Sequence, residues 1–223
     1  MNERIERRGE ILRADKPRQS IAGKPHEVAA RRIQGVGEPT MTPDREGKHL
    51  LCYYTEASNR LDRSVTICVA RSPIEARGEP GSWRKFHDGR WDEPGLGGHE
   101  TPVLRAEGGD VGQSHVTYVP AWERYVMVFC HQGFQDFQRG EARQSGVYLS
   151  TSRDGVVWTE PVRIVRVMTV FKTDRPCVQH PTLIVTRATK DRLEGRLFHA
   201  YTPRWPTPHH LASSPITIHL KAR

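Results

Sequence analysis

The chain lacks the features that would assign it to a membrane, metal-binding or nucleotide-binding class. No apolar run approaches the length of a membrane span, and the charged start, residues 1–10, leads into no apolar signal segment. "GLGG" at 95–98 is followed by no Lys-Ser/Thr pair, which argues against a phosphate-binding loop, and "HHLASS" from His209 lacks a third spaced metal ligand. We therefore expect a cytoplasmic protein that makes no membrane contact and needs no cofactor.

Cysteine is scarce and follows no metal-binding or redox pattern. The four cysteines, Cys52, Cys68, Cys130 and Cys177, form no Cys-x-x-Cys pair, and three of the four lie inside apolar, strand-like stretches. This pattern predicts buried free thiols rather than zinc ligands or disulfides, and it favours a reducing compartment.

The composition favours a turn-rich β protein over a helical one. Of 223 residues, only 36% are hydrophobic and 27% are charged, and the chain contains 19 Gly and 16 Pro. The net charge of +8 raises nucleic-acid binding as an alternative function. The Arg residues are scattered through turns and strand ends without a long basic run, which is also typical of a solvated surface.

A repeat runs through the chain. Segments beginning at Gly37, Ser114 and Gln179 each contain a short strand, a polar turn and a second apolar strand. A third strand follows in each, and Trp83 and Trp158 mark the start of a fourth in the first two. The repeat length of about 70 to 80 residues predicts an all-β fold, a β-propeller with three recognisable four-stranded blades.

The stretch Ser152-x-Asp154-Gly155-x-x-Trp158 predicts the turn between the third and fourth strands of a blade. Ser and Asp side chains can accept hydrogen bonds from backbone N–H groups of the turn, and Gly supplies a positive φ. The Trp is expected to pack between neighbouring blades. This turn resembles the Asp-box of sialidases, which is a structural device rather than a catalytic one.

The sequence divides into a charged N-terminal segment, residues 1–25, expected to be mobile or helical, and a partial propeller domain, residues 26–223. The third unit lacks a fourth strand, and "HEVAARRIQGV" at 26–36 is a candidate to complete it. Three blades do not comfortably close a ring. We therefore expect either part of a longer propeller or a homo-oligomer in which two chains complete six blades.

The first strand of each blade lines the funnel of a propeller, so side chains at equivalent first-strand positions converge. In "EPTM", "HVTY" and "HPTL" these positions are Glu38, His115 and His180, which are predicted to face one cavity. A carboxylate and two imidazoles there can perform acid–base chemistry, hold a cation or bind sugar hydroxyls. The alternative is that they only pack or hydrogen-bond in a wet channel.

Over residues 26–223 the blades resemble part of a five-bladed propeller glycosidase of the arabinanase, xylosidase and invertase type. Gly37-Glu38-Pro39 is similar to, but permuted from, the surroundings of that family's catalytic Glu. The resemblance implies a carboxylate triad, namely an Asp base, an Asp that tunes a pKa and a Glu acid, with Glu38 as the acid. It also implies one channel histidine near a bound cation such as calcium, for which the candidate counterparts are His115 or His180.

The sequence departs from that family because no first strand carries the Asp base, and glycoside hydrolysis requires two carboxyl groups. Asp110 and Asp174, shortly before His115 and His180, are the alternative catalytic carboxylates, although Asp residues near Gly commonly form turns.

Three further residues are candidate sugar contacts. Glu100 offers another carboxylate, Arg175 offers forked hydrogen bonds, and Trp91 offers a ring for stacking. Glu100 and Trp91 belong to a Gly-rich stretch, residues 89–102, that is expected to form a loop at the rim of the binding face.

The sequence thus supports three functions. The first is a carbohydrate-active, glycoside-hydrolase-like propeller that hydrolyses or binds glycosides in its funnel. The alternatives are a non-catalytic sugar-binding or scaffold propeller and a basic nucleic-acid-binding protein. Two funnel carboxylates about 5–10 Å apart would distinguish the first from the second.

Overall fold

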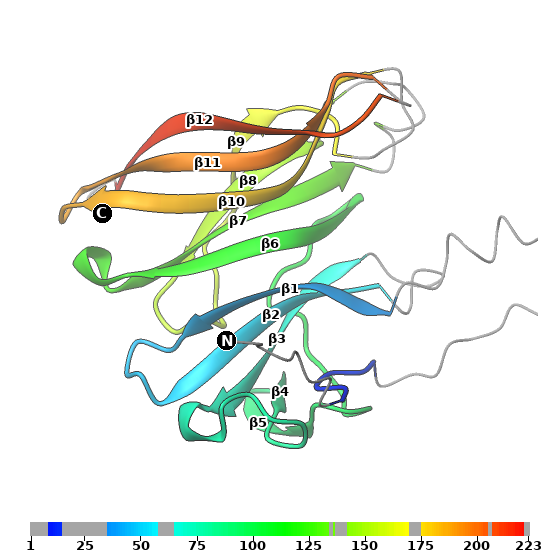
Figure 1. Ribbon diagram of the computed structural model, residues 1–223, viewed down its shortest axis with the longest axis vertical. Coiled ribbons are helices and arrows are strands. Elements are labelled where there is room, and N and C mark those ends of the chain that lie inside the picture. Colours follow the sequence, from blue (N-terminus) through cyan, green and yellow to red (C-terminus); the bar gives the residue numbers. More distant parts are fainter. Residues whose placement is uncertain are drawn as a thin grey trace, which may run out of the picture.

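The computed structural model describes residues 9–14, 35–57, 65–133, 136, 142–169, 175–204 and 207–220. Within these ranges the strands form three antiparallel sheets, which lie one beyond another along the molecule (Figure 1). The predicted all-β, propeller-type fold is therefore confirmed. Most of the charged segment 1–25 and of the candidate closing strand 26–36 falls outside the described residues. None of the helices found in the described ranges is long and apolar enough to cross a membrane.

The first sheet has five strands in sequence order, with the short 3-10 helix η1 (Ile74–Ala76) after its third strand. The strands are β1 (Val36–Pro43), β2 (His49–Glu56), β3 (Thr66–Pro73), β4 (Arg84–His87) and β5 (Arg90–Pro94). The fourth strand begins directly after Trp83, as the repeat predicts.

β5 corrects the expectation that residues 89–102 form a loop at the rim of the binding face. Asp88 and Gly89 have φ of 44° and 80°, and His87 pairs with Arg90, so the chain turns tightly and returns along β4. Positive φ at both central residues of a two-residue turn is the geometry that suits a twisted hairpin. The first half of the stretch is therefore a strand.

The second sheet has four strands and the third sheet has three among the described residues. The second contains β6 (Gly109–Val119), the 3-10 helix η2 (Pro120–Trp122), β7 (Arg124–Gly133), β8 (Gly146–Ser152) and β9 (Val162–Arg166). The third contains β10 (Cys177–Ala188), β11 (Arg192–Thr202) and β12 (His210–His219).

Three first strands, β1, β6 and β10, lie next to one another, with β6 between the other two (Figure 1). One apolar layer between the first and second sheets contains Tyr53, Ile67 and Met127. Another, between the second and third sheets, contains Val128 and Leu183. Because the second sheet is packed on both faces, β7 is buried almost throughout rather than on alternate residues.

The turn at Ser152–Trp158 has the predicted hydrogen bonds. The Ser152 hydroxyl accepts the Gly155 N–H at 2.9 Å and donates to Asp154 Oδ1 at 2.9 Å. The same carboxylate oxygen accepts the N–H groups of Val156 and Val157 at 2.9 and 2.8 Å. Gly155 has a φ of 80°, which a residue with a Cβ rarely adopts.

This turn also joins the first two sheets. The Tyr53 hydroxyl, on β2, donates to the Gly155 carbonyl at 2.8 Å, and the Trp158 ring packs edge-on against Tyr53 with centroids 5.9 Å apart. Trp158 therefore packs between neighbouring blades, as predicted.

All four cysteines are buried and free, as the sequence predicts. Burial raises the pKa of the Cys52 and Cys177 thiols to about 12, so neither is ionised near neutral pH.

Candidate functional site

Each first strand carries a β-bulge at the same place. Two residues of the first strand, 38–39, 113–114 or 180–181, lie opposite a single residue of the neighbouring strand. The first residue of each pair is Glu38, Gln113 or His180, with φ of 52°, 55° and 51°. These three residues are therefore the equivalent positions of the three blades.

The predicted equivalence of His115 with Glu38 and His180 is wrong by two residues. His115 follows the bulge of β6, and its counterparts are Thr40 and Thr182. Gln113 was not predicted from the sequence, although Gly37-Glu38 and Gly112-Gln113 share a glycine directly before the bulge.

Three consecutive residues of each first strand, 38–40, 113–115 and 180–182, line one hollow of about 180 Å³. Glu38, His115 and His180 therefore face the same cavity, with His115 reaching it from a different position along its strand. The lining offers a carboxylate, two imidazoles, an amide and several hydroxyls.

Glu38 uses its carboxylate to connect the first and second sheets. Oε2 accepts the Thr55 hydroxyl at 2.8 Å and the Gln113 N–H at 3.2 Å, and Thr55 Oγ1 accepts the same N–H at 3.0 Å. Gly112 makes this approach possible, because a Cβ there would lie 2.9 Å from the Thr55 side chain and 3.4 Å from Glu38 Oε2. Glu38 is thus a hydrogen-bond acceptor at the sheet boundary as well as part of the lining.

Gln113 connects the second and third sheets in the same way. Its side-chain oxygen Oε1 accepts the His180 N–H at 3.1 Å. The backbone of each of these two bulges is therefore held by the side chain of the bulge before it.

His115 and Ser114 leave polar atoms unused at this hollow. His115 Nδ1 and Ser114 Oγ are buried, and neither has a hydrogen-bond partner within the described part of the chain. Burial lowers the pKa of His115, so its ring is neutral near pH 7 and can either donate or accept. Buried polar atoms are normally paired, so these two atoms are exceptions, and their burial keeps them out of contact with the open hollow.

The other predicted carboxylates do not line this hollow. Asp110, near the start of β6, accepts the Val65 N–H at 2.9 Å through Oδ1 and so helps to hold the first sheet against the second. Glu100 is paired with Lys85, whose Nζ also donates to the carbonyls of Arg13 and Gly98 at 2.6 and 2.8 Å.

Asp174 lies outside the described residues, and Arg175 is exposed two residues before β10. Arg175 is not among the residues that line the hollow.

Trp91 lies at a second hollow, of about 400 Å³. Its ring packs against Phe86 with centroids 5.1 Å apart, and the Arg71 guanidinium lies 4.8 Å from its centroid. Asp44 and Asp154 complete the polar part of the lining. This hollow therefore combines an aromatic ring with charged groups, as small-molecule sites commonly do.

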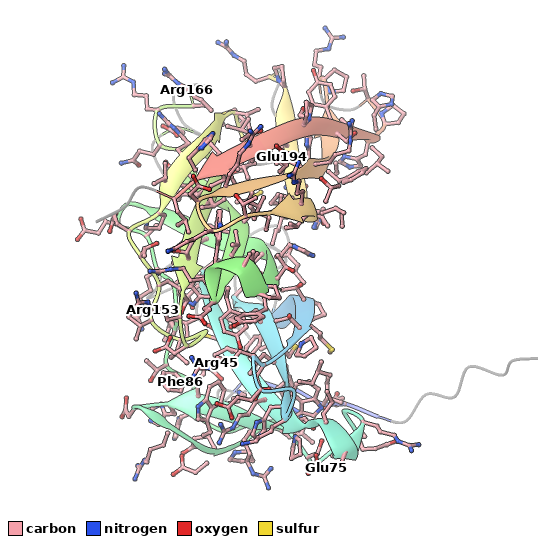
Figure 2. All side chains as sticks on the ribbon, turned by 90° about the vertical axis from the view of Figure 1, so that its left-hand side faces the viewer. Arg45, Glu75, Phe86, Arg153, Arg166 and Glu194 are labelled. Atoms are coloured by element: carbon pink, nitrogen blue, oxygen red, sulfur yellow. The ribbon has the colours of Figure 1, made fainter. Side chains whose placement is uncertain are left out.

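The two hollows lie at opposite ends of β1. Figure 2 shows Arg45, Phe86 and Arg153 on the face that carries the β1–β2 and β8–β9 turns, beside the second hollow. Asp44 directly follows the last residue of β1, whereas Glu38 is its third residue, a separation of about 20 Å at 3.3 Å per residue. The structure thus separates Trp91 from Glu38, His115 and His180.

Glu38 is the one carboxylate among the nine residues that line the first hollow. Across the described ranges no three His, Cys, Asp or Glu side chains gather closely enough to hold a metal ion. The arrangement can donate and accept hydrogen bonds with hydroxyl groups, but its described lining contains no second carboxylate to work with Glu38.

No protein-family model matches the sequence, and no curated protein matches it. Among solved structures, the chain is similar to the protein BT0996 in an RGII complex, with a TM-score of 0.50 and 12% identity over 82% of this chain and 52% of that one. It is also similar to the family 43 glycoside hydrolase YxiA of Bacillus licheniformis, with a TM-score of 0.48 and 10% identity over 84% and 44% of the two chains.

A third similar structure is a fructofuranosidase of Schwanniomyces occidentalis complexed with fructose, with a TM-score of 0.47 and 12% identity over 84% and 33% of the two chains. The chain thus spans between one third and about one half of the length of these proteins. At 12% identity and a TM-score of 0.50, the likeness to BT0996 is one of fold alone.

Proposed function

We propose that the protein binds carbohydrate without hydrolysing it, in the hollow formed by residues 38–40, 113–115 and 180–182. The observation that carries this proposal is the convergence of three equivalent bulges whose side chains include a single carboxylate. Glycoside hydrolysis needs a proton donor and a second carboxyl group, and the described lining supplies only Glu38.

The chemistry of the hollow suits hydroxyl groups. Glu38 is an acceptor, Gln113 has both a donor and an acceptor, and neutral His115 can serve as either. The hydroxyl groups of Thr40 and Thr182 add further donors and acceptors to the same lining. The choice of carbohydrate as the ligand class therefore rests on the hydrogen-bonding groups of the lining.

The proposal is tested by measuring binding of a panel of mono- and oligosaccharides to the purified chain by calorimetry or saturation-transfer NMR. His115→Ala removes one hydrogen-bonding group from the hollow and is expected to weaken binding about tenfold. Trp91→Ala is the matched control, because it alters the other hollow, and it should leave the affinity within about twofold. Loss of binding in Trp91→Ala but not in His115→Ala would move the site to the second hollow.

Hydrolysis is tested on aryl arabinosides, xylosides, galactosides and glucosides. We expect no turnover by the native chain, and Glu38→Gln should retain sugar binding because an amide oxygen can still accept the Gln113 N–H. Turnover that disappears in Glu38→Gln would establish a hydrolase and overturn the proposal. Binding of polynucleotide with a steep salt dependence, in place of sugar, would favour the nucleic-acid alternative.

A further inference from the structure

The three bulges form a chain of hydrogen bonds that passes from sheet to sheet. Glu38 Oε2 accepts the Gln113 N–H at 3.2 Å, and Gln113 Oε1 accepts the His180 N–H at 3.1 Å. Each link joins the side chain of one bulge residue to the backbone of the next bulge residue. The three side chains differ in chemistry, but each contains an acceptor atom.

The local backbone explains why this pattern repeats. The bulge residues have φ of 52°, 55° and 51°, so each N–H is turned out of the regular strand ladder and needs another acceptor. The neighbouring sheet supplies that acceptor twice. The same geometry at both sheet boundaries makes the link a property of the interface between successive blades.

His180 is the last residue in this series of hydrogen bonds, and the acceptor nitrogen of its imidazole ring is not used. Its side chain is exposed, and in the part of the chain that the structure describes neither ring nitrogen has a hydrogen-bond partner. A neutral imidazole has one acceptor nitrogen. By the repeat, that nitrogen is placed to receive an N–H from the bulge of a following blade.

The outer faces of the first and third sheets are suited to apolar packing against another sheet. On β10, Leu183 is buried against the second sheet, so its neighbour Ile184 faces away from it and is 47% exposed. Leu211 on β12 is 80% exposed. On the outer face of the first sheet, Cys52 and Tyr54 line a largely apolar hollow of about 270 Å³ together with residues 9–12 of the same chain, and the buried Tyr54 hydroxyl has no partner in the described structure.

We propose that two copies of this chain assemble about a two-fold axis into one closed ring of six sheets, in which His180 of each copy accepts the N–H of the partner's Glu38. To continue the series of hydrogen bonds, His180 needs the N–H of a bulge residue with positive φ on a first strand. In the first sheet this bulge residue is Glu38. A two-fold axis makes the contact twice and leaves no open end. Exposed apolar side chains on the third sheet then pack against the apolar hollow on the first.

The assembly is tested by light scattering coupled to size-exclusion chromatography over a range of concentrations. The chain mass is 25.4 kDa, and we expect a particle of twice that mass. Ile184→Glu places a charge in the proposed interface and should raise the dimer dissociation constant about a hundredfold. Val162→Glu is the matched control, because Val162 is also an exposed strand residue, at 63%, but lies on the outermost strand of the second sheet.

The hydrogen bond between His180 and the partner's Glu38 is tested by replacing His180. His180→Gln keeps an acceptor of the type that Gln113 provides and should preserve the dimer, whereas His180→Leu removes it and should weaken the dimer about tenfold. Both replacements are unbranched at Cβ and stand at the same positive φ, and near-UV circular dichroism confirms that each variant is folded.

A native chain that stays monomeric at all concentrations would overturn the proposal, and so would equal effects of Ile184→Glu and Val162→Glu. Growth into larger, open assemblies with concentration would reject the closed ring. None of these measurements needs a sugar ligand, so this proposal and the proposed function succeed or fail separately.

Discussion

The Lys85–Glu100 pair provides the sharpest test of how this structure is held together. The Lys85 side chain is fully buried, and the Glu100 side chain is 8% exposed. All three ammonium protons have acceptors, namely the Glu100 carboxylate and the carbonyls of Arg13 and Gly98. This one group therefore joins β4, the turn after β5 and residues 9–14.

Lys85→Met keeps the length of the side chain and removes its charge. Glu100 then loses its buried cation, and the two carbonyls lose a donor, which we expect to lower the free energy of unfolding by about 3–5 kcal/mol. Replacing both partners in Lys85→Met/Glu100→Met removes the uncompensated charge. The double variant should therefore be more stable than Lys85→Met alone by about 2 kcal/mol, and the unpaired carbonyls account for the remaining loss.

Urea unfolding followed by tryptophan fluorescence measures these differences, and the chain contains five Trp residues. The loss in Lys85→Met corresponds to a fall in the unfolding midpoint of about 1–2 M. Lys48→Met is the matched control, because Lys48 pairs with Glu46 on an exposed surface, and it should change stability by less than about 0.5 kcal/mol. Equal losses of stability in Lys85→Met and Lys48→Met would refute the structural role of the pair. Loss of sugar binding without loss of stability in Glu100→Gln would instead indicate that Glu100 contacts the ligand.

The Asp154 turn and the buried thiols lead to three further expectations. Asp154→Ala should lower the free energy of unfolding by about 1–2 kcal/mol, because three hydrogen bonds to Oδ1 are lost. Arg153→Ala, a change of an exposed residue in the same turn, should alter the free energy of unfolding by less than about 0.5 kcal/mol. Similar losses for the two variants in denaturant titrations would contradict this explanation. Although burial acts in the opposite direction, backbone hydrogen bonds lower the pKa of Asp154 below its ordinary 3.8. Its contribution to the free energy of unfolding is therefore complete above about pH 5 and is lost as the pH falls through the pKa of the folded state. A difference in stability between the native chain and Asp154→Ala that does not narrow on acidification would disprove this expectation. Cys52 and Cys177, whose thiol pKa burial raises to about 12, should react with a thiol reagent at pH 8 only as the chain unfolds, and rapid labelling of the native protein would show that they are accessible.

The features that depend on neighbouring residues could be predicted from the sequence. The alternating apolar runs predicted the strands, and Ser152, Asp154 and Gly155 predicted a turn whose hydrogen bonds the structure reproduces. The repeat also predicted three blades and a third sheet without a fourth strand. These features are local because a turn or a strand needs only its own side chains and backbone to be recognised.

The equivalence of the bulge residues was beyond the sequence, because a bulge inserts a residue without changing the apolar pattern that follows it. "HVTY" aligns well with "EPTM" by residue type, yet pairing with β7 places Gln113, not His115, at the position equivalent to Glu38 and His180. Strand register is set by the neighbouring strand. The glycine before Glu38 and Gln113 was the one local signal of the correct register.

The positions of the long polar and aromatic side chains depend on contacts between distant parts of the chain. Glu100 was predicted at the sugar site, but it lies against the buried ammonium of Lys85. Trp91 was predicted beside the same site, but the Asp88-Gly89 turn returns the chain along β4 and carries Trp91 to a different hollow. The partners of such side chains come from distant parts of the chain, and a buried charge can rest only where the fold supplies a counter-charge and hydrogen bonds.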